Sequence, residues 1–196
     1  MEIIAIVMVV GVLAYLASRA TSASRRDRDA FCEVWRAVAA KHGGAFTPGR
    51  DRTLGRDVIE VTRMDVRCTI SCYELTDLDG DGTTIYTSAQ ETARAPLKGQ
   101  ATAYPAGALS RFAQKLGAQD ITLGDEVFDR RFVVKASDDE VARAVLDAPT
   151  RRAILAIPRS VTLSYRAGVV ELRWEAEERE AQVLDAARDL VARVCR

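Results

Sequence analysis

The sequence predicts an α+β protein, in which an antiparallel sheet made of a meander and a C-terminal hairpin packs with amphipathic helices and is preceded by one N-terminal transmembrane helix. Three observations predict this class. Strand-like and helix-like segments come in separate runs without strict alternation, several segments alternate apolar and polar residues, and the N-terminus is almost uniformly apolar. With 196 residues, 48% of them hydrophobic, the chain can bury the core of one ordinary domain.

The N-terminal apolar run covers residues 3–17, between Glu2 and Arg19. As a helix it would be about 22 Å long, against roughly 30 Å for a bilayer core. The run can still span the bilayer, because polar side chains at its ends can extend to the headgroup region and the bilayer can thin locally. A cleaved signal peptide, the alternative, would begin with positive charge, which Met1 and Glu2 lack. We predict a transmembrane anchor over residues 1–20 that contacts the lipid bilayer through residues 3–17.

Basic residues follow the anchor and predict its orientation. They are Arg19, Arg25, Arg26 and Arg28. Because positive charge stays on the cytoplasmic side, we expect a single-pass protein of the bacterial inner membrane with a cytoplasmic soluble domain. The last three arginines could also contact anionic lipid headgroups.

The four cysteines agree with a reducing compartment. They are Cys32, Cys68, Cys72 and Cys195, and their spacing forms no disulfide framework. In a strand, Cys68 and Cys72 would be about 13 Å apart, too far for a bridge. We expect free, mostly buried thiols.

Beyond the anchor, we expect a polar linker over residues 21–27 and a single soluble α+β domain over residues 28–196. Its first element is an amphipathic helix that ends at Gly43 and Gly44. The helix carries apolar residues at helical spacing, namely Phe31, Val34, Trp35 and Val38.

Strand-like and alternating segments at residues 58–62 and 66–73, and a run rich in Thr, Ile and Tyr at residues 83–92, predict a meander of three strands. In the second strand, one face would carry Val66, Cys68, Ile70 and Cys72, and the other Arg67, Thr69, Ser71 and Tyr73. We expect the second and third strands to pair.

The second half predicts further helices and strands. Pro105 would open a helix closed by Gly117, with an apolar stripe made of Leu109, Phe112, Ala113 and Leu116. A strand is expected around Phe128 to Lys135, then a helix starting at Ser137, which forms a capping box with Glu140.

Pro149 would start another helix that runs to about Ile157. The chain then predicts a hairpin turning at residues 166–168. Its inward residues are Val161, Leu163, Tyr165, Val170, Leu172 and Trp174. A terminal helix follows, with one apolar face made of Val183, Leu184, Ala187, Leu190, Val191 and Val194.

The stretch DLDGDG, residues 77–82, resembles the start of a calcium loop. Asp77, Asp79 and Asp81 occupy the ligand positions and Gly82 the turn, but Ser88 stands where the closing glutamate is needed. Strand-like flanks and turn-forming residues favour a hairpin connection. The alternative is a calcium site completed by backbone carbonyls and water.

Other chemistry finds little support in the sequence. The 28 basic and 28 acidic residues balance, which disfavours nucleic-acid binding. The one histidine, His42, sits at a helix end without a catalytic partner pattern, and no phosphate loop, nucleophile elbow or zinc motif occurs. The run at residues 175–180, rich in glutamate, is interpreted as a strand end and helix start. We expect no enzyme and no cofactor.

The motif F-D-x-x-F-x-V is carried by Phe128, Asp129, Phe132 and Val134. With the following "APTRRAILAI" and "VTLSYRAGVVELRW", the chain resembles a group of bacterial membrane-anchored proteins of unknown function. In these, such a strand leads into an acidic-started helix, a short helix, a hairpin and a terminal helix. The resemblance implies an α+β domain on a membrane tether and no catalytic residues.

These observations favour a membrane-tethered, non-enzymatic interaction or scaffold domain that binds a protein partner or self-associates. An exposed apolar patch on the sheet, or on the helix over residues 28–42, would mark its interface. The alternatives are a ligand or cation sensor using the Asp77–Gly82 turn and, third, a hydrolase with dispersed carboxylates in a deep pocket.

Overall fold

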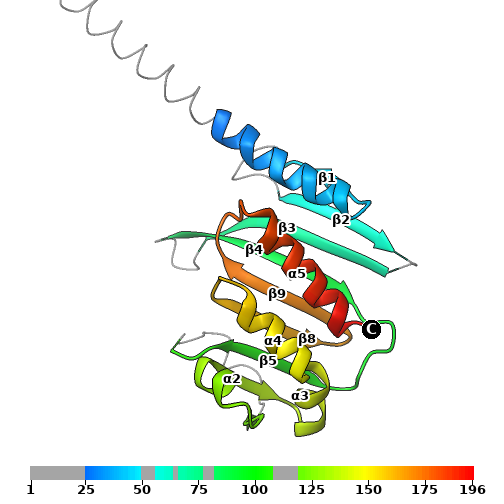
Figure 1. The fold of residues 1–196 in the computed structure, drawn as a ribbon, viewed down its shortest axis with the longest axis vertical. Helices are drawn as coiled ribbons and strands as arrows, with labels where there is room; N and C mark the ends of the chain where they lie inside the picture. Colours follow the sequence, from blue (N-terminus) through cyan, green and yellow to red (C-terminus); the bar gives the residue numbers. More distant parts are fainter. Residues whose placement is uncertain (1–24, 50–55, 64–65, 77–81, 108–118) are drawn as a thin grey trace, which may run out of the picture.

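The computed structural model describes residues 25–49, 56–63, 66–76, 82–107 and 119–196. Within these ranges the strands form one antiparallel sheet, and the helices lie on one side of it (Figure 1). The strands are β1 (Ala45–Thr47), β2 (Asp57–Arg63), β3 (Val66–Thr76), β4 (Thr83–Thr92), β5 (Gln100–Pro105), β6 (Gln119–Ile121), β7 (Phe132–Ala136), β8 (Val161–Arg166) and β9 (Val169–Glu175). The helices are an N-terminal helix over residues 25–41, α2 (Glu126–Arg131), α3 (Asp139–Val145), α4 (Ala148–Ala156) and α5 (Ala181–Val194). The predicted α+β class is confirmed.

The sheet joins the predicted meander to the predicted hairpin. Its strand order is β1-β2-β3-β4-β9-β8-β5-β7-β6. β2, β3 and β4 form the meander, and β9 pairs with β4, so the C-terminal hairpin extends the same sheet. The hairpin turns at Ala167 and Gly168, whose φ angles of 51° and 82° suit the positive-φ turn that two-residue hairpins favour.

Strand register divides the sheet residues between two faces. The face beneath the helices, here called the helix-covered face, receives buried residues from the central strands β3, β4 and β9, namely Cys68, Ile70, Cys72, Thr87, Ala89, Val170, Leu172 and Trp174. The opposite face carries no helix of the described residues over β3, β4, β9 and β8, and we call it the helix-free face (Figure 1). The predicted alternation of the second strand is confirmed by this division.

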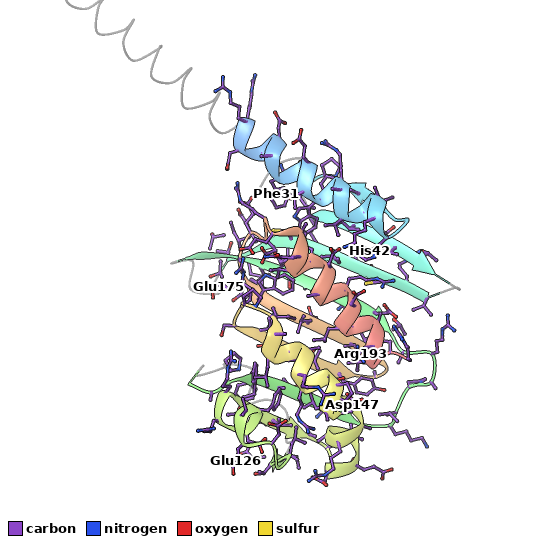
Figure 2. The ribbon with its side chains drawn as sticks, in the orientation of Figure 1. Phe31, His42, Glu126, Asp147, Glu175 and Arg193 are labelled. Carbon is purple, nitrogen blue, oxygen red and sulfur yellow. The ribbon has the colours of Figure 1, made fainter. Side chains whose placement is uncertain are left out.

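Two long amphipathic helices cover the sheet with the residues that the sequence predicts. The N-terminal helix buries Phe31 (labelled in Figure 2), Trp35 and Val38, and Phe31 stacks on Trp35 with ring centroids 5.1 Å apart. α5 buries five of its six predicted apolar residues and partly buries Val194. Burial of these stripes supplies the main hydrophobic stabilisation, at about 25 cal/mol per Å² of apolar surface.

The predicted start of the strand around Phe128 is wrong. Phe128 lies on α2, and the strand β7 begins at Phe132. Asp125 caps α2, because its carboxylate accepts a hydrogen bond from the Phe128 backbone N–H at 3.2 Å. The two rings stack across the junction with centroids 4.8 Å apart. A helix this short with one buried residue gives no helical period, so its apolar residue was assigned to the strand.

Two other helix starts also differ from the prediction. α3 is capped by Asp138, not Ser137, since the Asp138 carboxylate accepts from the Val141 N–H at 2.8 Å. Pro105 is the last residue of β5 and pairs with Phe132, so it does not open a helix at that point. The apolar stripe predicted after it, with Gly117, lies outside the described residues.

The helix at Pro149 is confirmed as α4, with Asp147 as its cap and Ile157 just beyond its end. The N-terminal helix already includes residues 25–27, so the predicted linker boundary is wrong for these three residues. The anchor predicted over residues 1–20 lies outside the described residues. Among the helices that the structure does describe, none combines the length and apolarity needed to cross a membrane.

Candidate functional site

A row of aromatic and arginine side chains crosses the helix-free face. Tyr73 on β3 lies opposite Tyr86 on β4, and their rings stack with centroids 6.2 Å apart. The guanidinium carbon of Arg56 lies 4.8 Å from the Tyr73 ring centroid, and that of Arg173 lies 5.2 Å from the Tyr86 centroid. Both tyrosines are half-buried. We call these four side chains the Arg–Tyr row.

A groove adjoins the row. It has a volume of about 600 Å³ and shares Arg173 with the row. Its lining comes from β4, β5, β8, β9 and the hairpin turn, and comprises Gln90, Gln100, Thr102, Thr162, Ser164, Tyr165, Arg166, Ala167, Val169, Glu171 and Arg173. Amide, hydroxyl and charged groups thus continue the helix-free face beyond the aromatic rings.

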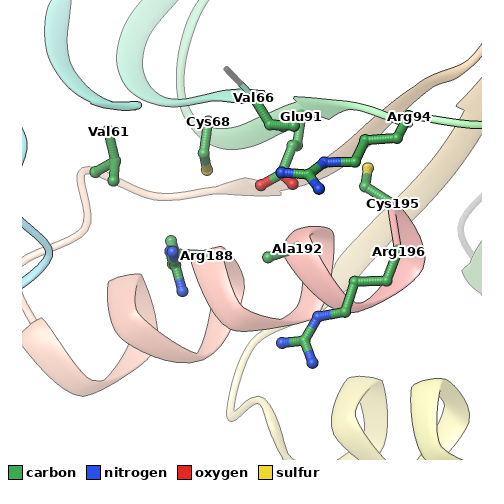
Figure 3. Close-up of a pocket in the computed structure, with 9 residues that line it drawn as sticks. All are labelled: Val61, Val66, Cys68, Glu91, Arg94, Arg188, Ala192, Cys195 and Arg196. Atoms are coloured by element: carbon green, nitrogen blue, oxygen red, sulfur yellow. The ribbon is translucent and has the colours of Figure 1, made fainter. Parts of the chain in front are cut away.

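A second cavity, the α5 cavity, lies on the helix-covered face between α5 and the strands β2 to β4. Its volume is about 390 Å³. Its lining residues, drawn in Figure 3, are Val61, Val66, Cys68, Glu91, Arg94, Arg188, Ala192, Cys195 and Arg196. Three arginines therefore share this cavity with one carboxylate.

Two charged side chains of the α5 cavity, Glu91 and Arg188, are partly withdrawn from solvent. Burial raises the pKa of Glu91, although the charges of Arg188, Arg196 and Arg94 and a hydrogen bond with the Cys68 thiol oppose the rise. The Arg188 side chain is only 13% exposed and pairs with Asp189 at 2.9 Å. Its Nε atom is buried and has no hydrogen-bond partner among the described residues.

The thiols beside this cavity are not activated. All four cysteines are free and buried, as predicted. Burial raises the pKa of Cys68 and of Cys195 to about 12, and the negative charge of Glu91 adds to both shifts. Since the thiolate is the nucleophilic form, these groups stay protonated at neutral pH and give no support to covalent catalysis.

A buried carboxylate, Glu178, organises the structure before α5. It is 1% exposed and accepts hydrogen bonds from Trp174 Nε1 at 3.0 Å and Arg159 Nε at 2.9 Å. Two backbone N–H groups, of Arg179 and Glu180, also donate to it. Its own carbonyl accepts from Trp35 Nε1 at 2.9 Å. Because its partners are all internal, Glu178 is a structural residue, which the simple strand-end interpretation of residues 175–180 missed.

The candidate calcium ligands Asp77, Asp79 and Asp81 lie outside the described residues. β3 and β4 pair antiparallel up to Thr76 and Thr83, so residues 77–82 connect two paired strands, as the hairpin interpretation expects. Within the described part of the chain, no group of three or more His, Cys, Asp or Glu side chains could hold a metal ion. A calcium role for this turn stays a prediction.

His42 links the end of the N-terminal helix to α5. Its Nε2 atom lies 2.7 Å from Asp185 Oδ1 on α5, and Lys41 pairs with the same carboxylate at 2.5 Å. The pKa of Asp185 is lowered overall: burial alone would raise it, but hydrogen bonds from Lys41 and His42 outweigh that effect. These contacts give His42 a structural position between the N-terminal helix and α5.

The exposed apolar patch expected at an interface is not found among the described residues. The exposed large hydrophobic residues there are Leu75, Leu97 and Val127, on separate elements. The apolar stripe of the N-terminal helix faces the sheet. The strongest surface feature is instead the Arg–Tyr row.

Sequence reasoning missed both the Arg–Tyr row and the α5 cavity. The row could have been predicted from the sequence, because pairing the second and third predicted strands about residues 77–82 places Tyr73 opposite Tyr86. No such signal exists for the cavity, because Glu91 and Arg188 come from distant segments that only the fold brings together.

No protein-family model matches this chain, and no curated protein matches it. Among solved structures, the chain is similar to the crystal structure of the mycobacterial trehalose monomycolate transport factor A, TtfA. The TM-score is 0.53 at 11% sequence identity, and the match covers 80% of this chain and 88% of that chain. At this identity the likeness shows a shared fold alone.

Proposed function

We propose that this chain is a membrane-tethered, non-enzymatic interaction domain that docks a protein partner through the helix-free face. The Arg–Tyr row is the observation that carries the proposal. Tyrosine and arginine are enriched in the energetically dominant parts of protein interfaces. Here two stacked tyrosines stand between two arginines on a face that no described helix covers.

The geometry of the row suits recognition. Stacking and the cation–ring contacts hold Tyr73 and Tyr86 in place before a partner arrives, so less side-chain entropy is lost on binding. The adjoining groove supplies hydrogen-bonding groups around the rings. A partner that presents apolar groups to the rings and carboxylates to Arg56 and Arg173 fits this face.

The membrane tether is supported by the sequence. The apolar run of residues 3–17 precedes the N-terminal helix in the sequence, and Arg25 and Arg26 of that helix are exposed. Arg28 serves the fold instead, since it pairs with Asp57 and lies over the Phe31 ring. Tethering raises the effective concentration of the domain near other membrane components. The fold neighbour is named as a transport factor, and an accessory role at a bacterial membrane is in keeping with that.

The α5 cavity does not fit the hydrolase hypothesis. The pocket that the hydrolase hypothesis needs would hold several perturbed acids, whereas the α5 cavity holds one, Glu91, beside unreactive thiols.

Site-specific photo-crosslinking in cells tests the interface. A benzophenone side chain replaces Tyr86, Tyr73 or, as a control, the exposed Glu33 of the N-terminal helix. We expect a discrete adduct from positions 73 and 86 that is lost when Arg173→Glu is added, with mass spectrometry identifying the partner or a second copy of the chain. Equal adducts from position 33, or none from the row, would overturn the proposal.

The tether is tested separately. Deletion of residues 1–20 should move the protein from the membrane fraction to the soluble fraction. The cytoplasmic orientation is tested with a membrane-impermeant maleimide on a Gly80→Cys chain whose four native cysteines are serine. Protection until the membrane is permeabilised is expected, and labelling in intact cells would reverse the orientation.

A further inference from the structure

We propose that the α5 cavity binds the phosphate group of a small molecule or lipid headgroup, with Arg188 as the buried contact and Arg94 and Arg196 at the entrance. This site is on the opposite side of the sheet from the Arg–Tyr row and is independent of the docking function. Arg188 is 13% exposed, whereas Arg94 and Arg196 are exposed. Figure 3 shows Arg94 beside Glu91, Arg188 on α5 across from them, and Arg196 just beyond the end of α5.

The first argument is the hydrogen-bonding state of Arg188. Its Nη1 atom bonds to Asp189, but its buried Nε lacks an acceptor in the described part of the chain. A buried donor of a charged group without a partner is costly. An oxygen of a bound anion would satisfy it, and the planar guanidinium matches the geometry of phosphate.

The second argument is charge. The cavity lining carries three guanidinium groups and one carboxylate. With Glu91 ionised and Asp189 paired with Arg188, these guanidinium groups still outnumber the carboxylates, and the remaining positive charge attracts a phosphate anion. In a partly buried site this attraction is screened less than at an open surface.

The third argument is size. At about 390 Å³ the cavity falls within the usual range of small-molecule sites, roughly 300 to 1,000 Å³. It therefore has room for a phosphate group and part of the molecule that carries it. Val61, Val66 and Ala192 provide apolar wall for that part.

The test is thermal unfolding of the full chain in a nonionic detergent, titrated with inorganic phosphate at constant ionic strength, with chloride as the reference salt. A ligand that binds the folded state raises the melting temperature in a saturable manner. Arg188→Gln should weaken the affinity at least about tenfold, because a charge-assisted hydrogen bond is lost. Glu91→Gln should tighten it, since a neighbouring negative charge is removed.

Arg193→Gln is the matched control, because Arg193 is an exposed α5 arginine outside the cavity. It should bind phosphate like the parent chain. If Arg188→Gln does not fold, Arg94→Gln takes its place and should lower the affinity by a few fold. Equal affinities in the parent, Arg188→Gln or Arg94→Gln chains, or a shift that does not saturate, would overturn the proposal.

Two further probes distinguish the source of the phosphate. These are glycerol 3-phosphate and a short-chain phosphatidic acid below its micelle concentration. Tighter binding of the short-chain lipid would assign a headgroup site, and equal or tighter binding of glycerol 3-phosphate a soluble ligand. Failure of all three probes would reject the phosphate site and leave the docking proposal untouched.

Discussion

The two faces of β3, β4 and β9 differ in chemistry although the same strands build both. On the helix-covered face these strands bury Ile70, Leu172 and Trp174 completely or nearly so. On the helix-free face they present Tyr73, Tyr86 and Arg173, half-buried and in contact with one another. Because side chains alternate along a strand, one segment can hold the fold together on one side and carry recognition on the other. The comparison predicts that changes on the two faces separate stability from binding.

The largest expected effect is on the helix-covered side. Glu178→Ala removes a buried carboxylate that pairs with Arg159 and accepts from Trp174. We expect a loss of about 3–5 kcal/mol in the free energy of unfolding, because the partners of a broken buried ion pair are left uncompensated. Urea denaturation followed by circular dichroism measures it. Glu180→Ala, which removes an exposed partner of Arg159, should cost less than about 1 kcal/mol.

A comparable loss in the free energy of unfolding is expected when the packing of the F-D-x-x-F-x-V segment is disrupted. Phe128 is fully buried and stacks on Phe132. Phe128→Ala should lower the unfolding free energy by about 3–5 kcal/mol. The neighbouring Val127 is 53% exposed, and Val127→Ala should change it by less than about 0.5 kcal/mol. Similar losses in the two variants would mean that α2 does not seat Phe128 in the core.

A moderate, pH-dependent effect is expected at Asp185. The pKa of this carboxylate is lowered from its usual 3.8 by hydrogen bonds from Lys41 and His42 that outweigh its burial. A lowered pKa contributes stability that is present above the unfolded pKa and lost as the pH falls through the folded pKa. Asp185→Asn should therefore cost about 1 kcal/mol at neutral pH and little in acid. A constant difference between the two chains from pH 7 down to pH 2 would contradict this.

The Arg–Tyr row should contribute little to stability. A double-mutant cycle of Arg173→Ala and Tyr86→Ala should give a coupling of about 0.5–1 kcal/mol, typical of an exposed cation–π contact. With the benzophenone side chain at position 73, the same changes should abolish crosslinking to a partner. If they instead unfold the domain, the helix-free face is structural and the contrast between the faces fails.

The smallest expected effect is that of calcium. If residues 77–82 form only a hairpin connection, adding millimolar calcium should leave the melting temperature unchanged, in the parent chain and in Asp79→Ala alike. A calcium-dependent rise that is lost in Asp79→Ala would establish the alternative cation-sensing function.

The elements that could be predicted from the sequence are those with a clear period. Alternation predicted β3 and the hairpin, a run rich in Thr, Ile and Tyr predicted β4, and a repeated apolar stripe predicted the N-terminal helix and α5. The strands β1, β5 and β6 were missed. β1 and β6 have three residues each and carry no period, and β5 ends at Pro105, which was predicted to open a helix. The start of β7 was misplaced because α2 is only six residues long.

The candidate functional surfaces were harder to predict from the sequence than the secondary structure. The Arg–Tyr row needs strand register in addition to alternation, because stacking joins Tyr73 to a residue of the next strand. The α5 cavity joins Glu91 on β4 to Arg188 on α5, and a local pattern cannot reveal such contacts. The structural role of Glu178 was missed for another reason. In a run of acidic residues, the sequence does not distinguish a buried carboxylate from its exposed neighbours.

Hydroxyl-radical footprinting of the tyrosines tests the docking role of the helix-free face most directly. Modification of Tyr73 and Tyr86 is compared between native membranes and the purified full-length chain, with the exposed Leu97 and Val127 as internal references. We predict that both tyrosines are protected in membranes and become reactive after purification, while the references do not change. Equal tyrosine reactivity in the two preparations would contradict a partner seated on this face.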